Sequence, residues 1–169
     1  MTTLINRITI EAPRQAVWQV LSNLELLDHY DPGVRSSRLL DGPDAGDDGS
    51  ARSVLGLGAT RRCDLRPRGW FVERVVRWQP DQALAFDLVT CSLPVHQLRH
   101  DYTLTETGAI GGTCATTVTQ TMTYQLKYGL AGRLLDALVV RRQFDRGIKA
   151  FLRGLSEQVR SGRPATASD

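Results

Sequence analysis

The sequence predicts an α+β fold in which an antiparallel sheet is covered by one long C-terminal helix, with two short helices after the first strand. Three observations support this prediction. Residues 129–161 form the one long stretch with helical periodicity, since apolar residues recur there every three or four positions. Most of the preceding chain alternates between apolar and polar residues, as half-buried strands do. Turn-forming residues separate these stretches at short intervals, which favours antiparallel strands in succession.

The composition is that of one ordinary globular domain. The chain has 169 residues, of which 41% are hydrophobic and 23% are charged, enough for a single core. We expect the domain to span residues 1–161 and residues 162–169 to be a disordered tail. No apolar run reaches the roughly 20 residues of a membrane-spanning helix, and the N-terminus lacks a signal-peptide core. A cytoplasmic protein without stable membrane insertion is therefore expected.

Metal, cofactor and nucleic-acid binding are not indicated. The cysteines Cys63, Cys91 and Cys114 lie far apart and fit no disulfide or zinc pattern. The net charge is +3 at pH 7, but basic residues are dispersed among acidic ones except on the last helix, which argues against a nucleic-acid partner. We expect no metal and no cofactor, and a homodimer is left open.

The N-terminal part is expected to form a strand and two short helices. Residues 2–11 alternate, with Leu4, Ile8 and Ile10 on one side. Pro13 suits the first turn of a helix that buries Trp18. A second helical turn is expected within residues 23–30, before the Asp-Pro-Gly break at 31–33.

Seven further strand-like segments follow, joined by turns, from which about six strands are expected. Residues 41–50 carry four aspartates, but their spacing does not match a calcium-binding loop, so a solvated hairpin connection is expected. Strand-like sequence flanks the Gly-Leu-Gly segment at 56–58. The expected strand segments are 34–40, 51–57, 60–66, 69–78, 83–91, 95–105 and 113–126.

The residues that punctuate this order resemble those of the START-like, helix-grip superfamily, also described as polyketide cyclase/dehydrase or SRPBCC proteins. The resemblance rests on IEAPRQAVWQVLSN near the start, WFVERVVRWQP in the middle, Ser-Leu-Pro-Val at 92–95, Gly-Thr at 112–113 and GLAGRLLDAL before the final helix. It implies a strongly curved sheet of six to seven strands gripping the helix, an apolar cavity between them, and flaps at 56–59 and 92–94. Members of this superfamily include cyclases, aromatases, and lipid and hormone carriers, so the resemblance fixes no reaction.

If the sheet grips the helix, alternation along each strand identifies the side chains that face the cavity. The expected lining is apolar with a few polar groups, which is typical of small-molecule sites. The expected residues are His96, His100, Tyr102, Gln120, Met122, Tyr124, Trp70, Arg74, Phe86 and Leu88 from the strands, with Phe144, Ile148 and Phe151 from the helix.

Arg74 is the difficult member of this set. An inward arginine needs an anion, and the inward sets of the strands supply no carboxylate. Either the strand register shifts at Arg74, or its guanidinium meets an acidic ligand group or the carboxylate of Asp28 or Asp31.

Three functional hypotheses follow. The first is binding of a small hydrophobic molecule, aromatic, polyketide-like or lipid-like, in the cavity. The second is an enzyme, a cyclase/aromatase or dehydratase, in which His100 or His96 is the acid/base and a tyrosine or arginine stabilises an enolate. The third is a protein-interaction domain without a ligand. No nucleophilic triad is recognisable in the sequence.

Overall fold

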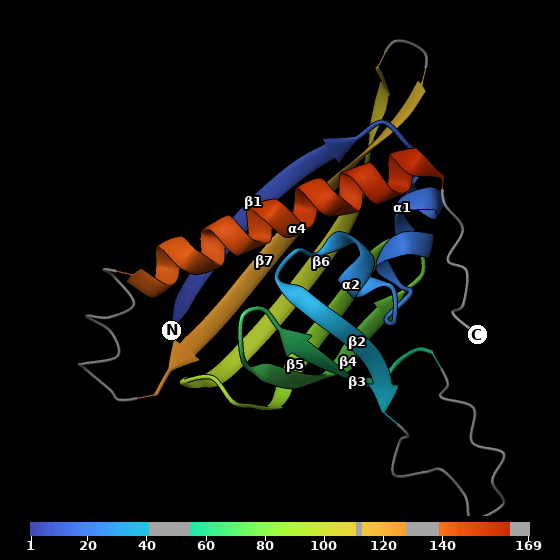
Figure 1. The fold of residues 1–169 in the computed structure, drawn as a ribbon. Helices are drawn as coiled ribbons and strands as arrows, with labels where there is room; N and C mark the ends of the chain where they lie inside the picture. The colour runs from blue at the N-terminus through green and yellow to red at the C-terminus, as the bar shows by residue number, and fades with distance from the viewer. Residues whose placement is uncertain (41–54, 111–112, 128–138, 163–169) are drawn as a thin grey trace, which may run out of the picture.

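The computed structural model describes residues 1–40, 55–110, 113–127 and 139–162. The elements occur in the predicted order (Figure 1). They are β1 (Thr2–Ile10), α1 (Arg14–Leu21), α2 (Leu27–Tyr30), β2 (Val34–Leu40), β3 (Thr60–Leu65), β4 (Trp70–Gln79), β5 (Ala83–Cys91), β6 (Val95–Ile110), β7 (Thr113–Leu126) and α4 (Arg141–Ser161).

Some predicted segments differ or lie outside the described residues. Residues 55–57, expected to end a strand, belong instead to a turn before β3. The acidic connection at 41–50, the strand expected over 51–54, the helix start at 129–138 and the tail at 163–169 lie outside the described residues.

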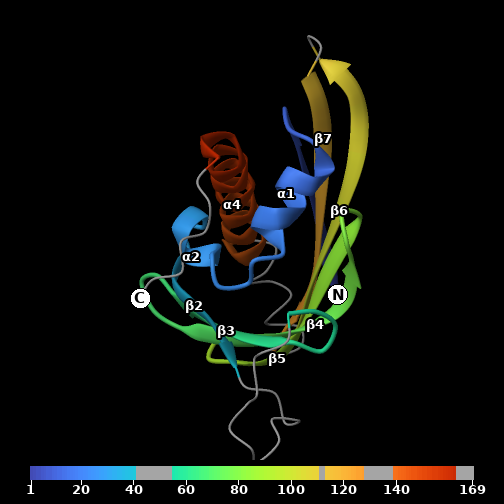
Figure 2. The same ribbon diagram turned by 90° about the vertical axis from the view of Figure 1, so that its right-hand side faces the viewer.

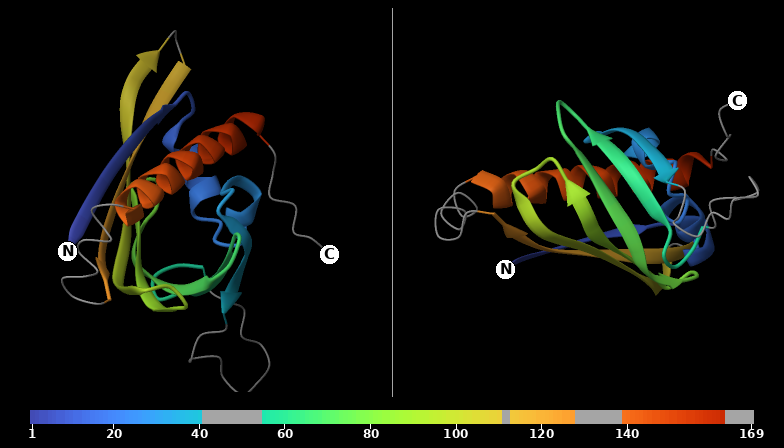
Figure 3. Two further views of the ribbon diagram at one scale, coloured as in Figure 1. Left: turned by 60° about the vertical axis from the view of Figure 1, so that its left-hand side comes forward. Right: turned by 90° about the horizontal axis from the view of Figure 1, so that it is seen from below.

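The seven strands form one antiparallel sheet with the order β1-β7-β6-β5-β4-β3-β2. The first strand pairs with the last, so that Thr2 lies opposite Tyr124. Seen along α4, the sheet bends around the helix: β6 and β7 stand on one side and β3, β4 and β5 pass beneath it (Figure 2). The long β6–β7 hairpin extends past the rest of the sheet (Figures 2 and 3). The predicted α+β helix-grip architecture is confirmed.

Helix α4 lies along the concave face of the sheet because one side of it is apolar. Ile148, Phe151, Leu152 and Leu155 on that side are buried, whereas the basic residues of the opposite side are exposed. No helix among the described residues is long and apolar enough to cross a membrane.

Two short helices close one end of the sheet. The indole of Trp18 on α1 meets that of Trp78 on β4 edge to face, with ring centroids 5.2 Å apart. Helix α2 approaches α4 so closely that a Cβ added at Gly154 would overlap the carbonyl oxygen of Tyr30. Glycine at position 154 therefore allows a direct contact between the two backbones.

A β-bulge in β4 overturns part of the predicted alternation. Val75 pairs with Phe86 and Arg77 with Ala85, which leaves Val76 as the extra residue. A bulge shifts the side chains on its two sides by one position, so Glu73 and Val75 are buried while Arg74 is exposed. The expected inward orientation of Arg74 is wrong, and the register shift that was left open is what occurs.

Candidate functional site

A cavity of about 190 Å³ lies between the sheet and α4. Its floor comes from β3, β4, β6 and β7, its roof from residues 143–151 of α4, and its remaining sides from residues 27–34 and Leu93. Most of the lining side chains are apolar, among them Leu98, Met122 and Phe144. The strands contribute side chains to this lining because residues that face inward alternate along each strand with residues that face solvent.

An ion pair is buried in the floor of the cavity. The guanidinium of Arg61 on β3 contacts Oε1 of Glu73 on β4 through Nε at 2.7 Å and Nη2 at 2.6 Å. Arg61 is 5% exposed and Glu73 is 2% exposed. The guanidinium also donates to the carbonyl oxygen of Leu24 at 3.3 Å and lies over the ring of Phe86 at 4.4 Å. Burial alone would lower the pKa of Arg61, but the charge of Glu73 and other neighbouring groups together raise it.

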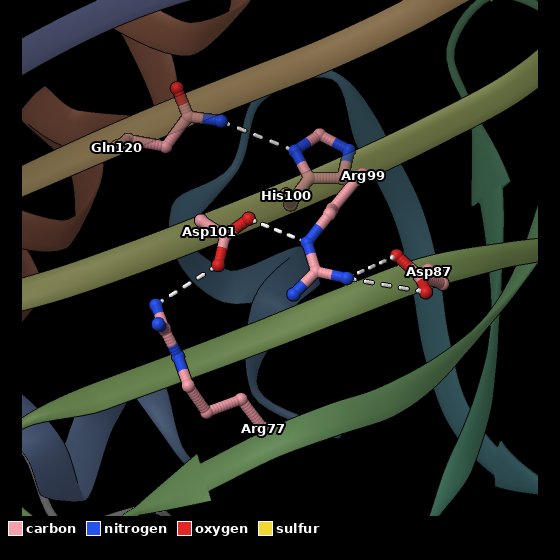
Figure 4. Close-up of polar contacts among 6 residues, drawn as sticks. All are labelled: Arg77, Asp87, Arg99, His100, Asp101 and Gln120. Atoms are coloured by element: carbon pink, nitrogen blue, oxygen red, sulfur yellow. Dashed lines mark hydrogen bonds and ion pairs between the residues drawn. The ribbon is translucent and has the colours of Figure 1, made fainter.

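His100 and Gln120 form the second polar group of the cavity. They are diagonal neighbours on one face of β6 and β7, because His100 pairs with Met122 and Tyr102 pairs with Gln120. Nε2 of Gln120 lies 3.2 Å from Nδ1 of His100 (Figure 4). Burial lowers the pKa of His100, although the charge of Glu73 acts in the opposite direction. The ring is therefore uncharged at neutral pH.

Aromatic rings connect these polar groups to the roof. The ring of Tyr102 is nearly parallel to that of His100, with an interplanar angle of 9°, and its centroid lies 5.6 Å from that of Phe151 on α4. The ring of Tyr30 from α2 also packs against Phe151, with ring centroids 5.7 Å apart. Burial raises the pKa of Tyr102 well above its usual value, so its hydroxyl stays protonated at neutral pH.

The structure brings seven of the predicted site residues to the cavity. These are His100, Tyr102, Gln120, Met122, Phe144, Ile148 and Phe151. Of the two predicted flaps, only 92–94 reaches the cavity, through Leu93.

The other predicted site residues lie elsewhere. His96 and Arg74 are exposed. The guanidinium carbon of Arg62 lies over the ring of Trp70, 4.5 Å from the centroid of that ring. Phe86 and Tyr124 are each 1% exposed and pack in the core, where Tyr124 meets Phe144 at 4.8 Å. Leu88 is also absent from the residues that line the cavity.

Arg61 and Glu73 are the buried charged residues of the lining that sequence reasoning missed. On β4, Glu73 is followed by Arg74, so each face of the strand carries a charged residue. Alternation alone cannot show which of the two faces points inward. On β3, the same is true of Arg61 and Arg62. The pair is identified by its cross-strand register, in which Arg61 lies directly opposite Glu73, and no local signal in the sequence marks it.

Charged residues on the outer face of the sheet form a different kind of network. Arg99 contacts Asp101 at 2.7 Å and Asp87 at 3.3 Å, and Arg77 contacts Asp101 at 2.9 Å (Figure 4). The side chain of Arg99 is 43% exposed. These pairs are partly exposed, and each is expected to contribute little to stability.

A second hollow, of about 570 Å³, lies outside the sheet between α2, α4 and Arg66. Its lining includes Arg153 and Glu157, which are exposed, and Asp28, which is half-buried. Although it is larger, it is not lined by the buried polar residues Arg61, Glu73 and Gln120 of the inner cavity. The inner cavity is therefore the candidate site.

Comparisons with solved structures agree with this architecture. A protein from Thermus thermophilus matches with a TM-score of 0.75 and 19% identity, over 96% of this chain and 100% of that one. A START superfamily protein from Mycobacterium smegmatis matches with a TM-score of 0.69 and 12% identity, over 94% and 97% of the two chains. Norcoclaurine synthase from Thalictrum flavum, in complex with dopamine and hydroxybenzaldehyde, matches with a TM-score of 0.66 and 13% identity, over 96% and 88%.

These identities are low, so the similarity extends to the fold alone. No curated protein matches the chain. The model of one protein family, described as polyketide cyclase/dehydrase and lipid transport, matches residues 1–160. That match covers nearly the whole chain and confirms the resemblance inferred from the sequence. The chain belongs to the polyketide cyclase/dehydrase and lipid transport family.

Proposed function

We propose that this protein binds a small hydrophobic molecule in the cavity between the sheet and α4. The observation that supports this most directly is the cavity itself, whose lining is largely apolar and has a few convergent polar groups. Such a lining is the usual form of a small-molecule site. A third hypothesis, an interaction domain without a ligand, is disfavoured because it predicts a filled interior.

The size of the cavity limits the ligand. A volume of about 190 Å³ is below the roughly 300–1,000 Å³ of pockets for drug-sized molecules. It is somewhat larger than the roughly 150 Å³ cavity known to hold benzene. A compact ring compound therefore fits better than a long lipid chain. Small aromatic molecules are also what norcoclaurine synthase, a protein of the same fold, holds.

The test is native mass spectrometry of the protein purified from cells, with a variant that fills the cavity. Gly147 lines the cavity, and a Cβ added there meets nothing within 4 Å. Gly147 is exposed at the rim of the cavity, so Gly147→Leu is expected to narrow the cavity without a clash. Arg146→Leu adds the same side chain on the exposed face and is the matched control.

We expect a bound small molecule in the unmodified protein and in Arg146→Leu, and less of it in Gly147→Leu. If the unmodified protein carries no adduct and shows no saturable binding of a fluorescent apolar probe, the proposal is wrong.

A second candidate function is catalysis in the same cavity, as a cyclase/aromatase or dehydratase. The observation that favours it is an uncharged His100 whose ring stacks on Tyr102. With Nδ1 taken by the amide of Gln120, the Nε2–H of the ring is suited to act as an acid toward a carbonyl oxygen. In this case His100→Gln abolishes turnover of the bound molecule while its affinity is largely retained. Equal loss of affinity and turnover favours binding alone.

A further inference from the structure

Helix α4 carries a stripe of basic side chains on the side that faces away from the core. We call this set the basic stripe; its members, all exposed, are Arg142, Arg146, Lys149, Arg153 and Arg160. They follow one another at steps of four, three, four and seven residues, so they lie on one side of an α-helix. At 1.5 Å per residue the stripe is about 27 Å long.

The positive charge of the protein is concentrated on this helix. Six basic and two acidic residues give α4 a net charge of +4. The whole chain has a net charge of +3, so the remainder of the chain has a net charge of −1. Within the stripe, Lys149 pairs with Asp145, with Nζ and Oδ2 2.6 Å apart. No other member has an ion pair among the described residues. Neighbouring like charges on a helix repel each other, so the stripe attracts negative charge from outside.

No described helix or strand covers the side of α4 that faces away from the sheet (Figures 1 and 2). The stripe also lacks exposed large apolar side chains; among the described residues the nearest in sequence is Val139, which precedes the helix. The centre of a stable protein interface is depleted of charged residues and enriched in aromatic ones. A side that is only charged therefore fits a surface with diffuse negative charge better than it fits a protein partner.

The basic stripe borders the mouth of the cavity. Two residues of α4 that line the cavity, Gln143 and Gly147, are exposed and form this side of its mouth. Each directly follows a member of the stripe, Arg142 or Arg146. One residue corresponds to a rotation of about 100° around a helix, so the mouth lies next to the stripe. A surface held by the stripe would thus lie beside the opening to the apolar cavity.

We propose that the basic stripe docks the protein on an anionic lipid bilayer, with the mouth of the cavity at the margin of the contact. Basic residues on a helix face are attracted to anionic lipid headgroups. The stripe has no aromatic side chain that could stack on nucleic-acid bases, and the apolar cavity beside it favours a lipid surface. Because no apolar side chain of the stripe inserts, the docking is peripheral and reversible by salt.

One consequence of docking rests on the proposed binding function. An apolar compound that partitions into the bilayer is held close to the mouth of the cavity. Compounds free in solution reach the cavity without docking.

The test is sedimentation of the unmodified protein with vesicles of phosphatidylcholine, with and without the anionic lipid phosphatidylglycerol. We expect binding only to the vesicles that contain phosphatidylglycerol. Raising the ionic strength from about 0.1 M to about 1 M shortens the Debye length from about 10 Å to about 3 Å and should release the protein.

Two double variants assign the docking to the stripe. Arg142→Glu/Arg146→Glu should weaken vesicle binding by at least about 25-fold, since each basic residue near an anionic surface contributes about fivefold. Arg35→Glu/Arg38→Glu makes the same change of net charge at two exposed arginines of β2, outside the stripe. This matched control should bind vesicles nearly as well as the unmodified protein.

The outcomes separate this inference from the proposed function. If the unmodified protein binds neither kind of vesicle, or binds both equally, the docking inference is overturned. It is also overturned if the two double variants lose the same affinity, or if duplex DNA competes the protein off the vesicles. In each case binding of a small molecule stands, because the fluorescent apolar probe measures it without vesicles. Should charge reversal prevent folding, Arg142→Gln/Arg146→Gln and Arg35→Gln/Arg38→Gln provide the same comparison.

Discussion

At the residue scale, the ion pair between Arg61 and Glu73 is the costliest feature of the site to maintain. Removing two charges from water carries a penalty of several kcal/mol per ion, which their attraction offsets only when the geometry is good. Here both bonds of the guanidinium converge on Oε1 of Glu73 at 2.7 and 2.6 Å. Such a pair is strongly coupled, since either member alone would be a buried, uncompensated charge.

We predict that Arg61→Met lowers the free energy of unfolding by about 3–5 kcal/mol, because it leaves Glu73 buried without its partner. The double variant Arg61→Met/Glu73→Leu should be more stable than this single variant. Urea denaturation measures both. Arg99→Met on the outer face is the control, and it should cost less than about 1 kcal/mol because Arg99 and its partners are partly exposed to solvent. Equal losses for Arg61→Met and Arg99→Met would contradict a buried pair.

We also predict a pH dependence that arises from His100. Burial lowers its pKa in the folded state, so as the pH falls below about 6.5 the unfolded chain binds a proton that the folded chain does not. Stability should therefore decrease as the pH falls from about 7 to about 5, by at most roughly 1.4 kcal/mol per pH unit from this group. Protonation also removes the acceptor for Gln120.

The measurement is denaturation at a series of pH values for the unmodified protein, His100→Asn and His96→Asn. Only His100→Asn should flatten the dependence in this range, because His96 is exposed. A profile that His100→Asn leaves unchanged would show that the histidine is not buried as described.

At the element scale, two glycines of α4 have opposite roles. Each lowers the intrinsic stability of the helix relative to alanine. Gly147 borders the cavity, where an added Cβ meets nothing, whereas Gly154 lies against the backbone of Tyr30. Only the second glycine is required by packing.

We predict that Gly147→Ala raises the free energy of unfolding by up to about 1 kcal/mol, through helix propensity. Gly154→Ala should lower it by about 1–3 kcal/mol or more, because the methyl group forces α2 and α4 apart. Denaturant midpoints of the two variants provide the comparison. A shift in the same direction for both would contradict the close contact at Tyr30.

At the scale of the whole molecule, the sequence predicted the fold better than it predicted the site. Element order followed from periodicity, since the long apolar stripe ending at Leu155 and Val159 differs clearly from the alternating strands. The inward faces of β6 and β7 could also be read, because Tyr102 and Leu104, or Gln120 and Met122, alternate with polar residues through regular pairing.

The residues of β3 and β4 that face the cavity could not be predicted from alternation. The extra residue Val76 reverses the alternation in β4, and nothing in the local sequence marks it as a bulge. Charged residues occur at positions 61, 62, 73 and 74, so both the inward-facing and the outward-facing residues of β3 and β4 include charges. The buried pair can be identified only from the pairing between strands, which a single sequence does not contain. The exposure of His96 has a similar origin, because the pairing shifts between Val95 and Gln97 and leaves His96 as an extra residue of β6.

The pairing of β1 with β7 has a consequence for how the protein forms in the cell. Thr2 contacts a strand partner, Tyr124, that follows it by 122 residues (124 minus 2), and such distant contacts slow folding because a long loop must close first. During synthesis β1 emerges before the other strands and stays unpaired until β7 has been made. The roof of the cavity, up to Phe151, emerges later still. The proposed ligand site is therefore complete only after Phe151 has left the ribosome.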